Sequence, residues 1–354
     1  MQQRIKKNPD GIKPIKTYQV ILPALLGIIV IAGLFLKEFD TSVFTTFSFS
    51  LKKILFLFFS LLVIIFIRDG SLMWRFRILA DRVISWKQAF NIHILSEFTS
   101  VITPTAVGGS SLVIYFLIKE GISSGRSTTI MFVNLFLDEL FFIVACPILF
   151  LIFPINKMFP PSVGLAPTMG YIFTGLYIFV LIWTLVLFVG IFIRPDWIKA
   201  ILLWIFKLPI LKRWRKNIEN MTDDLVRASQ DIKNRSFGFW LKLCLITATI
   251  WISRFLIVNI IFAAFVPVFN HLLVFSRQVV LWILMIAMPT PGGSGITEYM
   301  FKEYYSDLFQ SNSVLLIVVV IWRFVSFYLY LLLGVLILPR WFQRVRQSIL
   351  FSDN

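Results

Sequence analysis

Cysteine and histidine are scarce in this chain, which has two of each among its 354 residues. Cys146 and Cys244 both lie in apolar stretches, a setting typical of small buried residues rather than of a disulfide or a metal site. The sequence also has no nucleotide-binding loop, no nucleophile motif and no cluster with metal-ligand spacing. We therefore expect no metal ion, no cofactor and no catalytic residues, and we do not expect an enzyme.

Charged residues are also few. They make up 15% of the chain, whereas 58% of the residues are hydrophobic and the mean hydropathy is +0.85. Soluble domains carry about 25% charged residues. Phenylalanine and tryptophan, with 38 and 11 copies, supply surface for lipid contact, for helix packing and for the aromatic belts at membrane interfaces. The composition predicts an all-α polytopic membrane protein.

Negative charge is scarcer than positive charge, since 18 acidic residues face 34 basic ones. The basic clusters flank apolar runs at residues 4–16, 68–87, 194–235 and 340–346. The positive-inside rule places these clusters and both chain ends in the cytoplasm. Arg68 and Arg75 belong to the second cluster, so we expect them in a cytoplasmic segment. This distribution explains the net charge of +16 without a nucleic-acid partner.

Apolar runs of the length needed to cross about 30 Å of hydrocarbon recur along the chain. Six predicted spans cover Tyr18–Leu36, Leu51–Ile67, Ser127–Phe153, Tyr171–Ile193, Phe237–Phe265 and Ser313–Leu338. Within the basic segment 194–236, apolar residues recur at helical spacing at Ile218, Met221, Leu225 and Ile232. This pattern predicts an amphipathic cytoplasmic helix. We expect His271 and Arg277 in an outer loop.

Two further apolar regions are interrupted by nearly the same phrase, Pro-Thr followed by Gly-Gly-Ser, at residues 104–110 and 289–294. Proline and glycine break helices, and broken helices in a membrane usually surround a polar site. We therefore predict two re-entrant hairpins, near residues 90–120 and 277–309, that enter from opposite sides. The chain 1–354 would form one domain of two inverted repeats, 1–193 and 237–354. The alternative is that these residues only kink packed helices.

Ionisable residues inside apolar spans are costly, at roughly 2.5 to 3.5 kcal/mol each on insertion scales, and are therefore candidate site residues. Glu298 and Arg323 should lie close together, either to contact a ligand or only to assemble the helices. The other candidates within spans are Asp138, Glu139 and Arg254. Glu97 and His93 precede the first hairpin, where they either line its cytoplasmic mouth or cap a helix end.

Two blocks of sequence resemble a known family. One runs from Thr103 to Asp138 and includes Gly121-Ile122-Ser123 and Leu137-Asp138; the other runs from Pro289 to Glu298 and is followed by Arg323 and Gly334. Together they resemble the lysylphosphatidylglycerol synthase transmembrane, or flippase-like, family. The resemblance implies a bacterial cytoplasmic (inner) membrane protein that moves lipids between leaflets. The family members that this chain resembles are those without an aminoacyl-transferase domain.

The chain departs from that family at two places. Ser110, Ser111, Leu112 and Val113 stand where many relatives carry a charged residue, and Asn134 and Leu135 stand where many carry Glu-Arg. The lipid headgroup is therefore expected to differ.

We predict translocation of a phosphate-bearing lipid, with the helix N-termini at Gly108–Ser111 and Gly292–Gly295 offering N–H groups to the phosphate. A proton or ion gradient acting through Asp138, Glu139 or Glu298 is one candidate driving force. The predicted substrate-binding residues are Pro104, Thr105, Gly108, Gly109, Ser110, Asp138, Pro289, Thr290, Pro291, Gly292, Gly293, Ser294, Gly295, Glu298 and Arg323, with Glu97, Glu139 and Arg254 as secondary candidates.

Two alternatives remain open. One is an intramembrane enzyme or accessory in lipid or glycolipid synthesis, and the other is a structural or regulatory membrane protein. The expected partners are membrane lipids with an anionic headgroup, a second copy of the chain, or a separate synthase.

Overall fold

The computed structural model describes residues 17–38, 40, 50–103, 106–160, 166–205, 215–266, 269–288, 290 and 292–352. Regular structure in these residues is helical throughout. Four helical stretches among them are long and apolar enough to cross a membrane, namely Ser124–Ile152, Thr168–Ile193, Phe237–Phe265 and Asn312–Val345. The all-α architecture predicted from composition is therefore confirmed.

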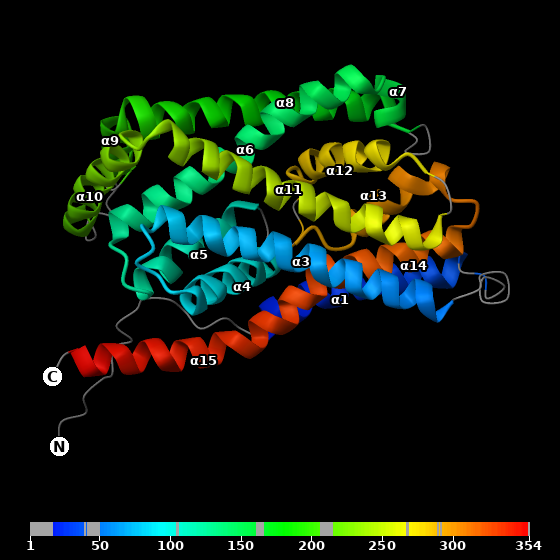
Figure 1. Cartoon of the computed structure of the whole chain (residues 1–354), viewed down its shortest axis with the longest axis horizontal. Helices are drawn as coiled ribbons and strands as arrows, with labels where there is room; N and C mark the ends of the chain where they lie inside the picture. The colour runs from blue at the N-terminus through cyan, green and yellow to red at the C-terminus, as the bar shows by residue number, and fades with distance from the viewer. Residues whose placement is uncertain are drawn as a thin grey trace.

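The long helices run side by side along the longest axis of the molecule (Figure 1). They are α1 (Thr17–Glu38), α3 (Leu51–Leu79), α6 (Ser124–Ile152), α8 (Ala166–Phe188), α11 (Phe237–Phe265) and the continuous helical stretch made of α14 (Asn312–Arg323) and α15 (Leu329–Ser352). Two π-helical turns prolong this set, η2 (Val189–Ile193) after α8 and η5 (Phe324–Tyr328) between α14 and α15. The short elements α7 (Ile155–Met158) and η4 (Ser306–Leu308) lie in connections.

Two pairs of shorter helices fill the space between the long ones. The first pair is α4 (Trp86–Ile102) and α5 (Ala106–Lys119), and the second is α12 (His271–Met285) and α13 (Ile296–Tyr305). The first pair occupies the half of the molecule that holds the end of α15, and the second pair occupies the opposite half (Figure 1). The two Pro/Gly phrases therefore connect the helices of two hairpins whose tips point toward the middle of the molecule.

The apolar cores follow the division of the molecule into two halves. One apolar core joins α11, α12, α13 and α14, and a second joins α3, α4, α5 and α6. Close crossings use small residues, because a glycine lets backbones approach. At Gly334 of α15, a side chain would collide with Phe98 of α4. At Gly125 of α6, it would collide with the backbone of the basic segment at Leu225.

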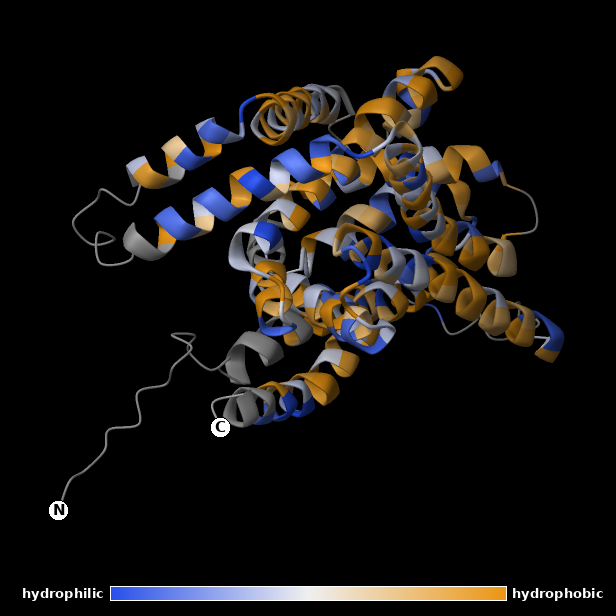
Figure 2. Cartoon of the chain, turned by 60° about the vertical axis from the view of Figure 1, so that its left-hand side comes forward, coloured by the Kyte–Doolittle hydropathy of each residue, from blue (hydrophilic) through white to orange (hydrophobic). Residues whose placement is uncertain are grey.

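The basic segment forms α9 (Pro195–Ile205) and α10 (Arg215–Lys233) at one end of the molecule. Hydrophilic and hydrophobic residues alternate along α10 in Figure 2, and its buried face packs against α6. Leu225 and Ile232 lie on that face and are buried. α10 is therefore amphipathic, as the spacing of its apolar residues predicts.

Two predicted boundaries are wrong. Helix α3 continues to Leu79, so Arg68 and Arg75 lie inside a helix and are buried, where the sequence predicted a segment after the helix end. Likewise Arg277 lies buried within α12 and not in an outer loop. The positive-inside rule predicts that arginines lie outside apolar helices. Here each of these guanidinium groups instead forms an ion pair with a carboxylate of the protein.

Candidate functional site

A cavity of about 370 Å³ lies between the two hairpin tips and the long helices α3, α6, α11 and α14. Polar side chains from every one of these elements reach it. They are Arg68, Arg75, His93, Ser96, Glu97, Ser100, Thr103, Asn134, Asp138, Arg254, Gln278, Thr290, Arg323 and Ser326. Aromatic rings of Trp251, Phe255, Trp282, Trp322 and Phe327 form much of the apolar remainder. Such a mixture is typical of a ligand site rather than of a packed core.

The tip of the second hairpin is a backbone turn that needs glycine. Gly292, Gly293 and Gly295 have φ angles of +56°, +69° and +87°, which other residues rarely adopt. A Cβ atom at Gly292 would lie 2.5 Å from Phe327 Cε2 and 2.8 Å from the carbonyl oxygen of Val101, which belongs to α4 of the first hairpin. The two hairpins therefore meet at this point, with no room for a side chain.

An ion pair fixes that turn from behind. Arg323 Nε donates to Glu298 Oε1 at 2.6 Å, and Arg323 Nη2 donates to the Gly292 carbonyl at 2.9 Å. Glu298 also accepts the Gly295 N–H at 2.7 Å. The side chains are 4% and 0% exposed. The predicted proximity of Glu298 and Arg323 is thus confirmed, and the carboxylate holds the tip from outside the cavity lining.

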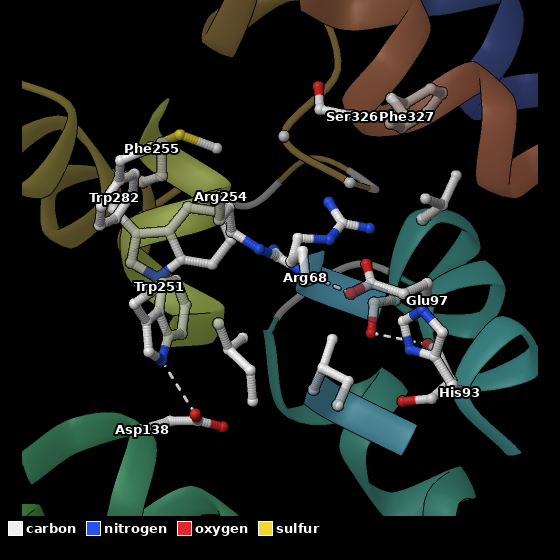
Figure 3. Close-up of a pocket in the computed structure, with 18 of the residues that line it drawn as sticks. Arg68, His93, Glu97, Asp138, Trp251, Arg254, Phe255, Trp282, Ser326 and Phe327 are labelled. Carbon is white, nitrogen blue, oxygen red and sulfur yellow. Dashed lines mark hydrogen bonds and ion pairs between the residues drawn. The ribbon is translucent and has the colours of Figure 1, made fainter. Parts of the chain in front are cut away.

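A second ion pair joins three long helices. Arg75 of α3 donates to both carboxylate oxygens of Asp138 on α6, at 2.6 and 3.0 Å. Trp251 of α11 donates its indole N–H to the same carboxylate at 2.9 Å (Figure 3). The bidentate geometry fixes the guanidinium plane as well as its distance.

A third ion pair bridges the first hairpin and α11. Arg254 donates to Glu97 of α4 and lies over the rings of Trp251 and Trp282, with its guanidinium carbon 5.3 and 5.1 Å from the two centroids. These side chains are 21% and 17% exposed, so this pair faces the cavity more openly than the Arg323–Glu298 pair.

Arg68 completes the charged lining. It donates to its neighbour Asp69 at 2.8 Å and to the hydroxyl of Tyr330, which in turn donates to Asp69 at 2.9 Å. His93 of α4 lies 3.3 Å from the same carboxylate. Arg68, His93, Glu97 and Arg254 converge in one region of the cavity (Figure 3).

Several lining atoms are buried yet have no hydrogen-bond partner among the described residues. They are Nε of Arg75, Nε of Arg254, Nε2 of His93, Oδ1 of Asn134 and Oγ1 of Thr290. A buried polar atom without a partner costs about 1–3 kcal/mol, so these atoms are candidate contacts for a ligand or for water in the cavity. Two of the five are guanidinium N–H donors, which suit an anionic oxygen.

The structure places some of the predicted site residues in the cavity lining and others outside it. The lining includes Glu97, Asp138, Arg254, Thr290, Gly292, Gly293 and Arg323. Ser294, Gly295, Glu298 and Glu139 lie outside it. Gly108, Gly109 and Ser110 lie near the start of α5, where the structure describes the helix but not the side chains, and Pro104, Thr105, Pro289 and Pro291 are not among the described residues.

The structure shows that two of the four N–H groups predicted to contact a phosphate at the second glycine turn have acceptors within the protein. The Gly293 N–H donates to the Thr290 carbonyl at 2.9 Å, and the Gly295 N–H donates to Glu298. These two N–H groups are taken within the protein, so arginine side chains are the better anion donors in this cavity.

Sequence reasoning missed Arg68, Arg75 and Asn134 as lining residues. A signal was present, because Arg68-Asp69 interrupts an otherwise apolar run with two opposite charges. Adjacent opposite charges inside such a run indicate an internal ion pair rather than the end of a helix.

Apolar helices arranged around a buried, ion-paired cavity define a multi-pass membrane protein. The chain belongs to the family described as "Lysylphosphatidylglycerol synthase TM region", whose profile matches residues 20–334. The resemblance drawn from the two Pro/Gly blocks is thereby confirmed. A UPF0104 membrane protein from Archaeoglobus fulgidus is 24% identical over 288 residues, which cover 77% of this chain and 84% of the relative. No solved structure shows a significant match.

Proposed function

We propose that this protein translocates a phosphate-bearing lipid across the cytoplasmic membrane, with the headgroup passing through the arginine-lined cavity and the acyl tails staying in the bilayer. The observation that carries the proposal is the lining itself, in which four arginines stand against two carboxylates, Glu97 and Asp138. The carboxylates that balance Arg68 and Arg323 lie outside the lining. The ligand therefore meets an excess of guanidinium groups.

The hairpins support the same function. Helix pairs that end at mid-molecule, in opposite halves, are typical of transporters built from inverted repeats. We propose that α4–α5 and α12–α13 are re-entrant hairpins, that the first enters from the cytoplasm and that both chain ends lie there, because the basic residues gather at that end. Family membership supports a role in lipid metabolism or transport, and we propose that the protein lies in a bacterial inner membrane.

We propose transport rather than catalysis. The carboxylates of the cavity, Glu97 and Asp138, each accept hydrogen bonds from an arginine, as do Asp69 and Glu298 behind it. Groups held in this way orient guanidinium donors and are poorly placed to exchange protons with a ligand. Movement of a headgroup needs only binding and release.

The test is transbilayer movement of fluorescent phospholipids in proteoliposomes, measured by quenching of the outer leaflet. Arg254→Gln should reduce movement of anionic lipids at least tenfold, because it removes a donor that faces the cavity. Arg227→Gln, an exposed charge on α10, should move lipid as the native chain does. Equal movement by all three proteins and by protein-free vesicles would refute translocation, and a chemically altered lipid in the same vesicles would favour an enzyme.

A further inference from the structure

Asn134 lines the cavity and differs from the arginines there, because its unpartnered atom is a hydrogen-bond acceptor and theirs are donors. It lies on α6 and is 7% exposed. Its Nδ2 donates to the Ile130 carbonyl at 2.9 Å, and its Oδ1 has no partner among the described residues. A carbonyl can only accept, so the amide nitrogen must face Ile130 and the amide oxygen must face the other way. Asn134 therefore contributes a buried hydrogen-bond acceptor that has no donor among the described residues.

The position of this acceptor relates it to the anion donors. Asn134 precedes Asp138 by four residues, so the two side chains lie on the same face of α6, one turn apart. Asp138 holds the guanidinium of Arg75, and Nε of that guanidinium is one of the unpartnered donors. A ligand bound here must accept a hydrogen bond at one group and donate a hydrogen bond at another group nearby.

Charge decides what kind of donor the ligand carries. An ammonium group would need a carboxylate, but Asp138 and Glu97 in the lining are each paired with an arginine. An ammonium group would also approach four guanidinium groups, and like charges in a cavity repel strongly. An uncharged hydroxyl donates to an amide oxygen without this penalty.

We propose that the headgroup recognised by this cavity is a phosphodiester that carries a hydroxyl-bearing substituent, such as a glycerol or a sugar, and that Asn134 is the residue that selects the hydroxyl. This inference rests on the proposed function for its lipid, and it names the substrate class. The phosphodiester contacts the arginines, and the hydroxyl donates to Asn134 Oδ1. Amine-bearing headgroups, aminoacylated lipids among them, fit this site poorly.

The experiment compares headgroups of matched charge. The full-length protein in detergent is titrated with phosphatidylglycerol, with phosphatidylethanol, which has the same single negative charge and no hydroxyl, and with phosphatidylethanolamine. Binding is measured by the change in intrinsic tryptophan fluorescence. The variant is Asn134→Leu. The control is Asn259→Leu, because Asn259 is also buried with unpartnered side-chain atoms but lies outside the cavity lining.

We expect phosphatidylglycerol to bind about tenfold more tightly than phosphatidylethanol, since an unsatisfied acceptor is left with the latter. Asn134→Leu should bring that ratio to about one, and Asn259→Leu should keep the native ratio. A native ratio near one, a ratio that survives Asn134→Leu, or tighter binding of phosphatidylethanolamine would overturn the proposal.

Two further arms separate this inference from the proposed function. Soluble glycerophosphoglycerol carries the same phosphodiester and the same hydroxyl groups without acyl tails. Binding of it as tight as that of phosphatidylglycerol would identify a soluble polyol phosphate as the ligand and overturn the lipid assignment. If the hydroxyl preference holds in detergent but no lipid moves in proteoliposomes, headgroup recognition stands and translocation fails.

Discussion

The two hairpins share a sequence phrase but are held differently where they meet. In the second hairpin, Arg323 and Glu298 bind the glycine turn through its backbone, and both side chains are almost completely buried. In the first hairpin, the charged residues lie on the side of α4, where Glu97 reaches Arg254 and His93 lies near Asp69. The second arrangement fixes a backbone shape, and the first leaves charges open to the cavity.

The bases of the hairpins are more alike. At the end of α5, Glu120 accepts hydrogen bonds from Trp341 at 2.6 Å and from Arg344, both on α15. At the start of α12, Arg277 binds both oxygens of Asp307 at 2.6 and 2.8 Å. Each hairpin is therefore anchored at its base by an ion pair. The comparison indicates that the second tip mainly supports the site and that the first hairpin contributes the groups that face a ligand.

The largest expected effect comes from breaking the buried pair. Arg323→Ala leaves the Glu298 carboxylate buried without its partner, which should cost about 3–5 kcal/mol of stability. Thermal unfolding in detergent measures this loss. Arg323→Lys keeps the charge but loses the forked geometry that also reaches the Gly292 carbonyl. Its melting temperature should therefore lie between those of the native protein and Arg323→Ala. An unchanged melting temperature for Arg323→Ala would contradict the proposed support of the second tip.

The next effect concerns the glycine turn itself. Gly292→Ala combines an unfavourable φ with a collision against Phe327 and Val101, and should cost about 2–3 kcal/mol. Gly175→Ala on α8 is the matched control, because nothing lies within 4 Å of its added carbon and alanine favours a helix. The melting temperature of Gly292→Ala should therefore fall, whereas that of Gly175→Ala should stay unchanged or rise. A tolerated Gly292→Ala would show that the tips do not need this close approach.

The smallest effect on stability, about 1 kcal/mol, is expected for Glu97→Gln, because this pair is partly exposed to the cavity. Its effect on lipid movement should nevertheless be large, about tenfold, since Glu97 orients the Arg254 guanidinium. Transport and melting temperature measured on the same preparation separate the two effects. Loss of stability equal to that of Arg323→Ala would remove the distinction between the hairpins.

Part of the site could be predicted from the sequence. Glu298 and Arg323 are charges that an apolar span tolerates only as a pair, and the glycines of 292–295 indicate a turn that side chains would block. Asp138 was predicted for the same reason as Glu298. Arg68 and Arg75 could not be placed in this way, because a basic residue after an apolar run has the same pattern at a membrane surface and inside a protein. Only their partners, Asp69 and Asp138, distinguish the two cases.

The sequence by itself determined the solvent, the helical class and the positions of the two breaks, because hydropathy, proline and glycine act over a few residues. The tertiary structure decided which charges share the cavity. Arg75, Asp138 and Trp251 are more than 60 residues apart in pairs, and only the packing of α3, α6 and α11 brings them into one hydrogen-bonded group. It also decided which atom of the Asn134 amide has no partner among the described residues, because the Ile130 carbonyl accepts from its nitrogen.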